Sequence, residues 1–197
     1  MNKPSPYSEF TIKWATLEWE KAQAYQLRKQ VFCDEQAMFD ESDLDDIDKQ
    51  SHLIVAIGGY GGWHEEIVGT VRIYQAEPGI WYGSRLAVSN DFRRQGQLGP
   101  ALIKLAVSSA HAIGCSHFYA HVQQQNQRLF ERMHWEKIGE MIIRETNHVV
   151  MQADLEHYPP NFIPEKGFMV RSRSHHRIQH LAPCLLPEHT LNLQQAI

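Results

Sequence analysis

The segment from residue 90 to 115, NDFRRQGQLGPALIKLAVSSAHAIGC, restricts the fold more than any other part of the chain. Its apolar residues recur at steps of three, four and seven or eight, which is the period of a helix with one buried side. Apolar segments typical of strands lie on either side, at 80–88 and 116–123. A strand, a helix and a strand in this order predict a right-handed crossover between two parallel strands.

The remaining segments predict further strands and helices. Alternating or short apolar runs typical of strands occur at 9–15, 51–59 and 66–75, and two more lie within 137–155. Helical periodicity is present at 17–36 and 126–135. The element order is therefore β-α-β-β-β-α-β-α-β-β, which belongs to the α/β (α+β) class.

Length and composition limit what such a chain can be. A chain of 197 residues suits one domain of ordinary size with some residues left over. Its formal net charge of −4 argues against a nucleic-acid partner. Its three cysteines form no disulfide framework, and no apolar run is long enough to cross a membrane. We therefore expect a cytoplasmic protein with no membrane partner.

Two arginines and two glycines stand where the helix after residue 90 begins, at Arg93, Arg94, Gly96 and Gly99. A helix start carries unpaired N–H groups and partial positive charge, so phosphate oxygens bind well there. Glycine removes the Cβ that would keep a ligand away from the backbone, and arginine adds charge. The pattern predicts a cradle for a pyrophosphate, and the alternative is a tight turn with surface arginines.

The wider segment RLAVSNDFRRQGQLGPALIKLA resembles the acetyl-CoA motif of the GNAT acyltransferase superfamily. That motif is a strand ending in L-x-V, then R-x-x-G-x-G/A and a helix. Here the second small residue comes one position late, which gives R-x-x-G-x-x-G. The resemblance implies that the cofactor is bound by the strand end and by the loop and helix start: Leu86, Ala87, Val88, Arg93, Arg94, Gln95, Gly96, Gln97, Leu98 and Gly99.

Two further blocks extend the resemblance. QNQRLFERMHWEKIG is similar to a family segment in which Asn126 would lie beside the pantetheine arm and Phe130 replaces a tyrosine that acts as general acid. LRKQVFCDEQAMFDESDLDDIDKQSHLIVA resembles a GNAT subgroup, and the chain also resembles the small group labelled nitrogen-starvation acetyltransferases. We accordingly expect a GNAT domain over 9–157 and a C-terminal extension of unknown role over 158–197.

Membership in this family would imply a definite fold and reaction. The sheet would be mixed and mostly antiparallel, with a central parallel strand pair splayed for acyl-CoA and helices on both faces. Acetyl-CoA would be the co-substrate, and a small-molecule primary amine would attack the thioester directly while a base removes its proton. Glu35 and His121 are the candidate catalytic bases, His52 is a third, and Tyr119, Tyr82 or water could protonate the leaving thiolate.

Two other functions stay open. The pattern of Arg28, Phe32, an acidic loop over 39–48 and Arg72 loosely resembles acyl-homoserine-lactone synthases, although the intact arginine–glycine loop favours CoA. The replacement of tyrosine by Phe130 also allows a catalytically silent acyl-CoA-binding module. The acidic loop is either solvated or draws a cationic acceptor to the cleft.

The last forty residues differ in composition from the rest. After Tyr158 the chain is rich in proline and histidine and has no clear period. We expect no metal site, because the spacing of the candidate ligands matches no compact zinc centre: His175, His176, His180, Cys184 and His189. A homodimer is an allowed assembly, and the sequence does not identify the acceptor.

Overall fold

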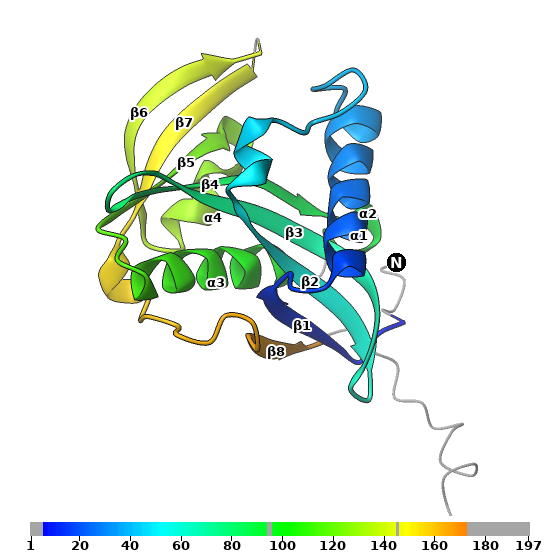
Figure 1. The fold of residues 1–197 in the computed structure, drawn as a ribbon. Helices are drawn as coiled ribbons and strands as arrows, with labels where there is room; N and C mark the ends of the chain where they lie inside the picture. Colours follow the sequence, from blue (N-terminus) through cyan, green and yellow to red (C-terminus); the bar gives the residue numbers. More distant parts are fainter. Residues whose placement is uncertain (1–5, 94–95, 145, 173–197) are drawn as a thin grey trace, which may run out of the picture.

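A computed structural model of the chain describes residues 6–93, 96–144 and 146–172. Its centre is an eight-stranded sheet with the strand order β6-β7-β5-β4-β3-β2-β1-β8 (Figure 1). The strands are β1 (Glu9–Trp14), β2 (His52–Tyr60), β3 (Trp63–Glu77), β4 (Ile80–Val88), β5 (His117–Gln123), β6 (Trp135–Ile143), β7 (Thr146–Ala153) and β8 (Phe168–Arg171). Neighbouring strands pair antiparallel except β4 and β5, which pair in parallel. The predicted mixed sheet with a central parallel pair is confirmed.

Helices cover both faces of this sheet (Figure 1). The helical elements are α1 (Glu18–Lys29), the π-helix η1 (Gln30–Glu35), η2 (Asp46–Lys49), α2 (Asn90–Arg93), α3 (Leu98–Ala112), η3 (Gln124–Asn126), α4 (Gln127–Glu131) and η4 (Leu155–His157). The apolar stripe of α3, with Leu102 and Leu105 fully buried, packs with Phe10 and Phe118 on one face. On the opposite face α1 contributes Leu27 to a second cluster.

Two predicted helices differ from the observed ones. The helix predicted over 17–36 is α-helical only to Lys29 and continues as the π-helix η1. The helix predicted over 126–135 ends at Glu131, because His134 takes a left-handed conformation with φ 62° and β6 begins at Trp135. The indole of Trp135 is buried there and donates to the Tyr158 hydroxyl over 2.9 Å.

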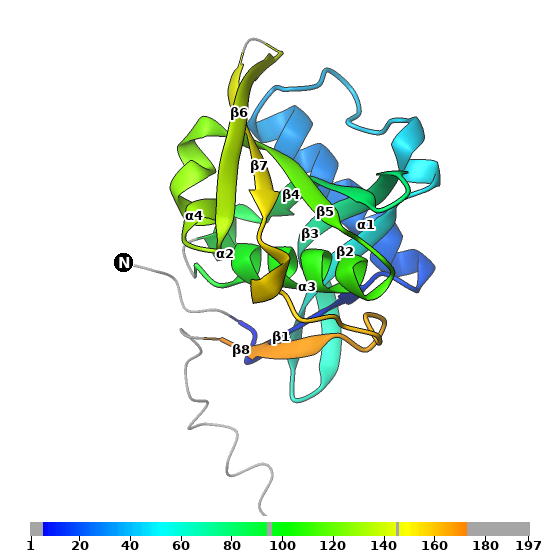
Figure 2. The same ribbon diagram turned by 90° about the vertical axis from the view of Figure 1, so that its left-hand side faces the viewer.

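The beginning of the predicted C-terminal extension is part of the sheet. Strand β8 pairs antiparallel with β1 at the edge of the sheet (Figure 2). Tyr158 is only 3% exposed, and its hydroxyl donates to the Met133 carbonyl over 2.5 Å. Tyr158 therefore belongs to the core, and Phe168 and Val170 of β8 pack against it, which composition alone did not indicate. The histidines from His175 onward and Cys184 lie outside the described residues.

Two statements about membranes and metals apply to the described part of the chain. None of its helices is long and apolar enough to span a bilayer. None of its histidine, cysteine, aspartate and glutamate side chains gather in threes as metal ligands would.

Candidate functional site

The two central strands separate halfway along their length. β4 and β5 pair only from Ile80 to Gly83, opposite His117 to Ala120. Beyond this point β5 continues beside β7, and β4 continues beside β3. A bulge in β4 accompanies the separation, because Arg85 and Leu86 are both inserted opposite one residue of β3 and Arg85 has φ 54°. Such a bulge bends a strand, and here it opens the sheet.

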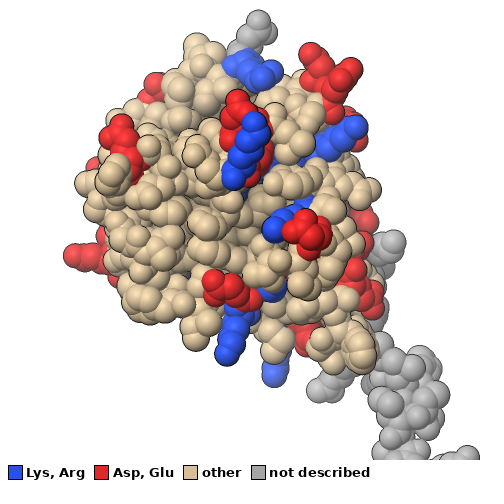
Figure 3. Space-filling model, in the orientation of Figure 1, with Lys and Arg blue, Asp and Glu red and all other residues tan. Residues whose placement is uncertain are grey.

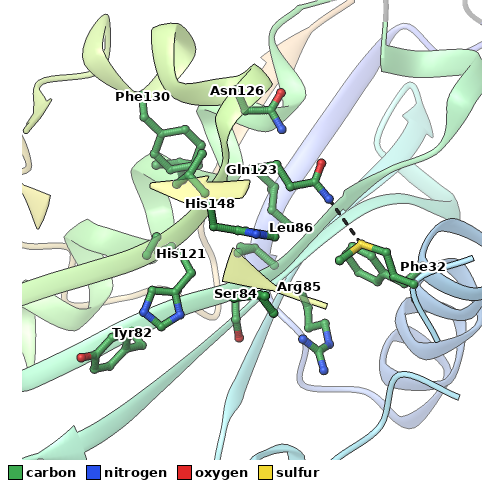
Figure 4. A pocket seen from close by; sticks show the side chains of 18 of the residues that line it. Phe32, Tyr82, Ser84, Arg85, Leu86, His121, Gln123, Asn126, Phe130 and His148 are labelled. Atoms are coloured by element: carbon green, nitrogen blue, oxygen red, sulfur yellow. Dashed lines mark hydrogen bonds between the residues drawn. The ribbon is translucent and has the colours of Figure 1, made fainter. Parts of the chain in front are cut away.

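A cavity of about 410 Å³ lies at this opening (Figure 4). Its wall toward α3 and α4 is apolar and includes Phe118, Phe130 and Trp135. Its other wall is aromatic and polar. The polar and aromatic side chains of that wall are Phe32, Gln36, Phe39, Tyr74, Tyr82, Ser84, Arg85, His121, Gln123, Arg144 and His148. The cavity thus joins an apolar compartment to a polar one through the sheet, which is the arrangement needed to bring two substrates together from opposite sides.

The start of α3 has the open backbone that the glycines predict. Gly96 has φ 68°, and a Cβ placed on either Gly96 or Gly99 would meet no atom within 4 Å. The first intrahelical bond runs from the Ala101 N–H to the Gln97 carbonyl, so the Leu98 and Gly99 N–H groups precede it. These N–H groups can donate hydrogen bonds to phosphate oxygens, and no protein atom has to move to make room for the phosphate.

The side chains of the same loop are used differently from the expectation. The Gln97 amide donates to the Arg171 carbonyl over 3.0 Å, and Leu98 is 1% exposed in the core. Only the backbone of these two residues can meet a cofactor. Arg94 and Gln95 lie outside the described residues, so their predicted contacts stay predictions.

Arg93 is held by two protein groups. Its Nε donates to the Val88 carbonyl over 2.8 Å, and its Nη2 lies 2.5 Å from Glu35 Oε2. Glu35 therefore lies at the predicted cofactor loop and is not among the residues that line the cavity. The structure thus brings Glu35 and Arg93 together. From the sequence, Glu35 was expected at the amine acceptor and Arg93 at the phosphates of CoA.

His121 does line the cavity, and its ring lies 5.7 Å from that of Tyr82 (Figure 4). Partial burial, and to a smaller extent the neighbouring His148, hold the pKa of His121 below its ordinary value. A neutral imidazole at neutral pH can accept a proton. The third candidate, His52, stacks on Trp14 with ring centroids 4.1 Å apart and does not line the cavity.

Some of the other predicted cofactor residues line the cavity and some do not. Leu86, Asn126 and Phe130 line the cavity, whereas Ala87 and Val88 do not. Phe130 packs edge to face on Trp135, with ring centroids 5.0 Å apart, and so forms part of the apolar wall. Of the two candidate acids, Tyr82 lines the cavity and Tyr119 does not, although the two rings lie only 5.5 Å apart.

The acidic loop pairs with buried arginines. Arg28 is fully buried and donates to Asp43 over 2.8 Å and to Asp48 over 2.6 Å. Arg72 is paired with Asp45 over 2.5 Å and with Asp48 over 2.9 Å. Burial alone would raise the pKa of Asp48, but hydrogen bonds from Arg28 and the Asp45 backbone lower it to about 2.

These pairs change the interpretation of the loop. Asp43 and Asp48 neutralise arginines inside the protein, and Asp45, whose side chain is 36% exposed, pairs with Arg72 and Arg85, so the charges of all three carboxylates are already balanced. On the face shown in Figure 3, acidic and basic side chains lie among each other rather than in one large patch. The loop is a structural support behind the cavity.

Sequence reasoning missed several residues that line the cavity. Tyr74 and His148 lie on strands with ordinary alternation, and Arg144 is at a hairpin turn. Gln123 ends β5, where its amide donates to Gln36 over 3.3 Å. For Tyr74 and His148, the only clue in the sequence was the alternation of side chains along a strand, which determines which residues share a face of the sheet.

Comparisons with known proteins agree with this geometry. A family model described as the acetyltransferase (GNAT) family matches residues 13–135. Among solved structures, an acyl-CoA N-acyltransferase of Pseudomonas aeruginosa is 20% identical with a TM-score of 0.60, covering 74% of this chain and 99% of that one. ElaA of Escherichia coli is 20% identical with a TM-score of 0.61, covering 74% and 98%.

A third solved structure is a CoA-dependent acyl-homoserine lactone synthase, BjaI, with SAM and isopentyl-CoA. It is 17% identical with a TM-score of 0.64, and the match covers 81% of this chain and 94% of that one. At these identities the structures share a fold with this chain. No curated protein sequence matches the chain.

Proposed function

The chain belongs to the GNAT acetyltransferase family, and on that premise we propose that it transfers an acyl group, with acetyl as the expected group, from acyl-CoA to a primary amine of a small molecule. The observation that carries the proposal is the separation of β4 from β5 after Gly83, with a cavity in the opening. The β4 edge from Ser84 onward has no strand beside it on the β5 side within the described residues. An extended pantetheine arm fits such an edge in the manner of an added strand.

The chain's own groups have distinct tasks in this proposal. The backbone N–H groups of Leu98 and Gly99 bind phosphate oxygens at the start of α3. Leu86 and the apolar wall position the arm so that the thioester reaches the polar wall. His121 removes a proton from the amine, a nitrogen–carbon bond forms at the acyl carbon, and the carbon–sulfur bond breaks as the thiolate leaves.

The leaving thiolate needs no strong acid. Phe130 cannot donate a proton, but Tyr82 lies beside His121 in the cavity and carries a hydroxyl. Water is the alternative donor. It is sufficient because a thiol has a pKa only slightly above neutral, so its thiolate is a good leaving group. The replacement of tyrosine by phenylalanine at position 130 is therefore compatible with turnover.

Calorimetry with CoA and mass spectrometry of reactions with amines test the proposal. We expect acetyl-CoA to bind and a panel of small primary amines to yield at least one product heavier by an acetyl group. Binding without any product, at every amine offered, would instead support a catalytically silent acyl-CoA-binding module.

One observation favours a second candidate function. Arg28 and Arg72 are joined through Asp48, and Phe32 of the same segment lines the cavity. These are residues whose pattern resembles acyl-homoserine-lactone synthases, and BjaI shares the fold. Supplying SAM and isopentyl-CoA in place of the amine panel tests this candidate, because lactone formation is detected by mass spectrometry.

A further inference from the structure

The described lining of the cavity contains basic side chains but no carboxylate. Two arginines and two histidines line it, together with Tyr74 and Tyr82, and its described lining includes no aspartate, glutamate or lysine. Resting on the proposed amine acylation, we propose that the acyl acceptor is an amine that also carries a carboxylate, and that Arg144 binds this carboxylate.

Arg144 is held in place by the loop that follows η1. Its Nη1 donates to the Met38 carbonyl over 3.2 Å, and its guanidinium lies 4.3 Å from the centroid of the Phe39 ring. A guanidinium has five N–H donors, so this single bond leaves donors for a ligand. Within residues 6–93, 96–144 and 146–172 no carboxylate forms an ion pair with Arg144. The structure thus presents an exposed cation at the cavity, oriented by one backbone carbonyl and one aromatic ring.

The second arginine of the cavity has its charge balanced by the protein. Arg85 also lies over Phe39, 4.6 Å from the ring centroid. Its Nε lies 3.0 Å from Asp43 Oδ2, and its Nη2 lies 3.2 Å from Asp45 Oδ2. Arg85 is therefore part of the arginine–aspartate network behind the cavity, and Arg144 is the cation that a ligand would meet.

The charges of the cavity disfavour the cationic acceptor that the acidic loop first indicated. Asp43, Asp45 and Asp48 are each paired with arginines, so their charges are already balanced by the protein. A simple ammonium would instead approach the positive charge of Arg144. A carboxylate on the acceptor is attracted to Arg144 where an ammonium is repelled. A guanidinium can donate two parallel hydrogen bonds to one carboxylate.

Matched pairs of acceptors test the proposal: several amino acids, each compared with the amine that remains when its carboxylate is removed. For the wild-type protein with acetyl-CoA we expect kcat/KM to be at least about tenfold higher for the amino acid of a pair. Arg144→Gln should abolish this preference by raising KM for the amino acids, and the rates with the simple amines should stay equal or rise, because the charge that opposes an ammonium group is removed. Arg144→Lys should restore part of the preference, because it keeps the charge and loses the fork.

Arg132→Gln serves as the matched control, since Arg132 is an exposed arginine that does not line the cavity. Equal rates with both members of each pair, or a preference for the simple amine, would overturn this inference and leave the acyltransferase proposal standing. If no amine is acylated, the proposed function fails. Calorimetric titration of the same compounds into the CoA-loaded protein then decides on Arg144, which is supported only if the amino acids alone bind and Arg144→Gln removes that binding.

Discussion

Glu35 Oε2 lies 2.5 Å from Arg93 Nη2, so a side chain from the π-helix after α1 is tied to the last residue of α2, where the loop toward α3 begins. The two side chains are 26% and 38% exposed, and a pair at this exposure contributes little to stability. Its consequence is for ligand binding, because the carboxylate occupies a guanidinium group that a phosphate would use. In the proposed CoA complex, Glu35 and the pyrophosphate would compete for the guanidinium of Arg93.

Replacing Glu35 by Gln should therefore strengthen CoA binding. Arg93 loses its anionic partner and becomes free to turn toward phosphate, so we expect the dissociation constant to fall about threefold, or roughly 0.6 kcal/mol. The value of kcat should change less than threefold, because Glu35 does not line the cavity. Calorimetry and steady-state kinetics measure the two effects. A loss of about 10²-fold in kcat with unchanged CoA affinity would return Glu35 to the role of base.

His121→Gln should lower kcat by roughly 10²-fold and leave the dissociation constant of CoA nearly unchanged. The wild-type rate should rise with pH through the pKa of His121, since an imidazole must be unprotonated to accept a proton. Burial places this pKa below the ordinary value of 6.5, so the rate should be lost only as the solution becomes more acidic than that. A pH–rate profile of both proteins checks this. The same acidic limb in His121→Gln would assign it to another group.

Gly99→Ala distinguishes the role of Gly99 in helix stability from its predicted role in CoA binding. The added Cβ has open space and alanine favours helix, so the free energy of unfolding should stay unchanged or rise by up to about 1 kcal/mol. The same Cβ stands where phosphate oxygens would approach, so CoA binding should weaken about tenfold. Gly96 is a poorer probe because its φ of 68° makes any side chain strained. Unchanged CoA affinity in the folded variant would place the phosphates elsewhere.

The local periodicity of the chain was enough to predict most of the strands and the crossover, and the glycine pattern predicted the open helix start, whereas the mixed sheet was predicted from the family resemblance. The strands, the crossover and the helix start depend on residues that are close in sequence. The apolar stripe of α3 and the open backbone at Gly96 both arise from a single short segment. The cavity depends on distant segments instead. Arg144, Met38 and Gln123 meet only because the β6–β7 hairpin and the end of β5 come to the loop after η1. No spacing in the sequence records that contact, and the same holds for Glu35 with Arg93.

The first part of the C-terminal extension should be needed for stability. A chain ending at His157 loses Tyr158, whose hydroxyl bonds Trp135 in the cavity wall, and loses β8. We expect its melting temperature to fall by many degrees, because a buried aromatic residue alone contributes about 3 kcal/mol or more. A chain ending at Ser172 is the control and should melt close to the full-length protein. Equal melting of both shortened chains would show that β8 and Tyr158 are dispensable.

Asp48→Asn should destabilise the protein in a pH-dependent way. The carboxylate faces Arg28 and Arg72, so its removal leaves buried charge unbalanced and should cost about 3 kcal/mol of unfolding free energy at pH 7. The pKa of Asp48 is about 2 in the folded protein against an ordinary value of 3.8, so the folded state binds this proton less tightly than the unfolded state. The stabilisation is therefore complete above about pH 4 and is lost as the pH falls toward 2.

Urea denaturation of the wild type and Asp48→Asn between pH 7 and pH 3 measures this difference. The gap between the two proteins should be constant from pH 7 to about pH 5 and should narrow below pH 4. Asp46→Asn is the matched control, because Asp46 pairs with Lys49 at the surface, with side chains 94% and 81% exposed, and should change stability by less than about 0.5 kcal/mol. A gap that stays the same down to pH 3 would mean that the buried network does not depend on the charge of Asp48, and that the loop is held by packing alone.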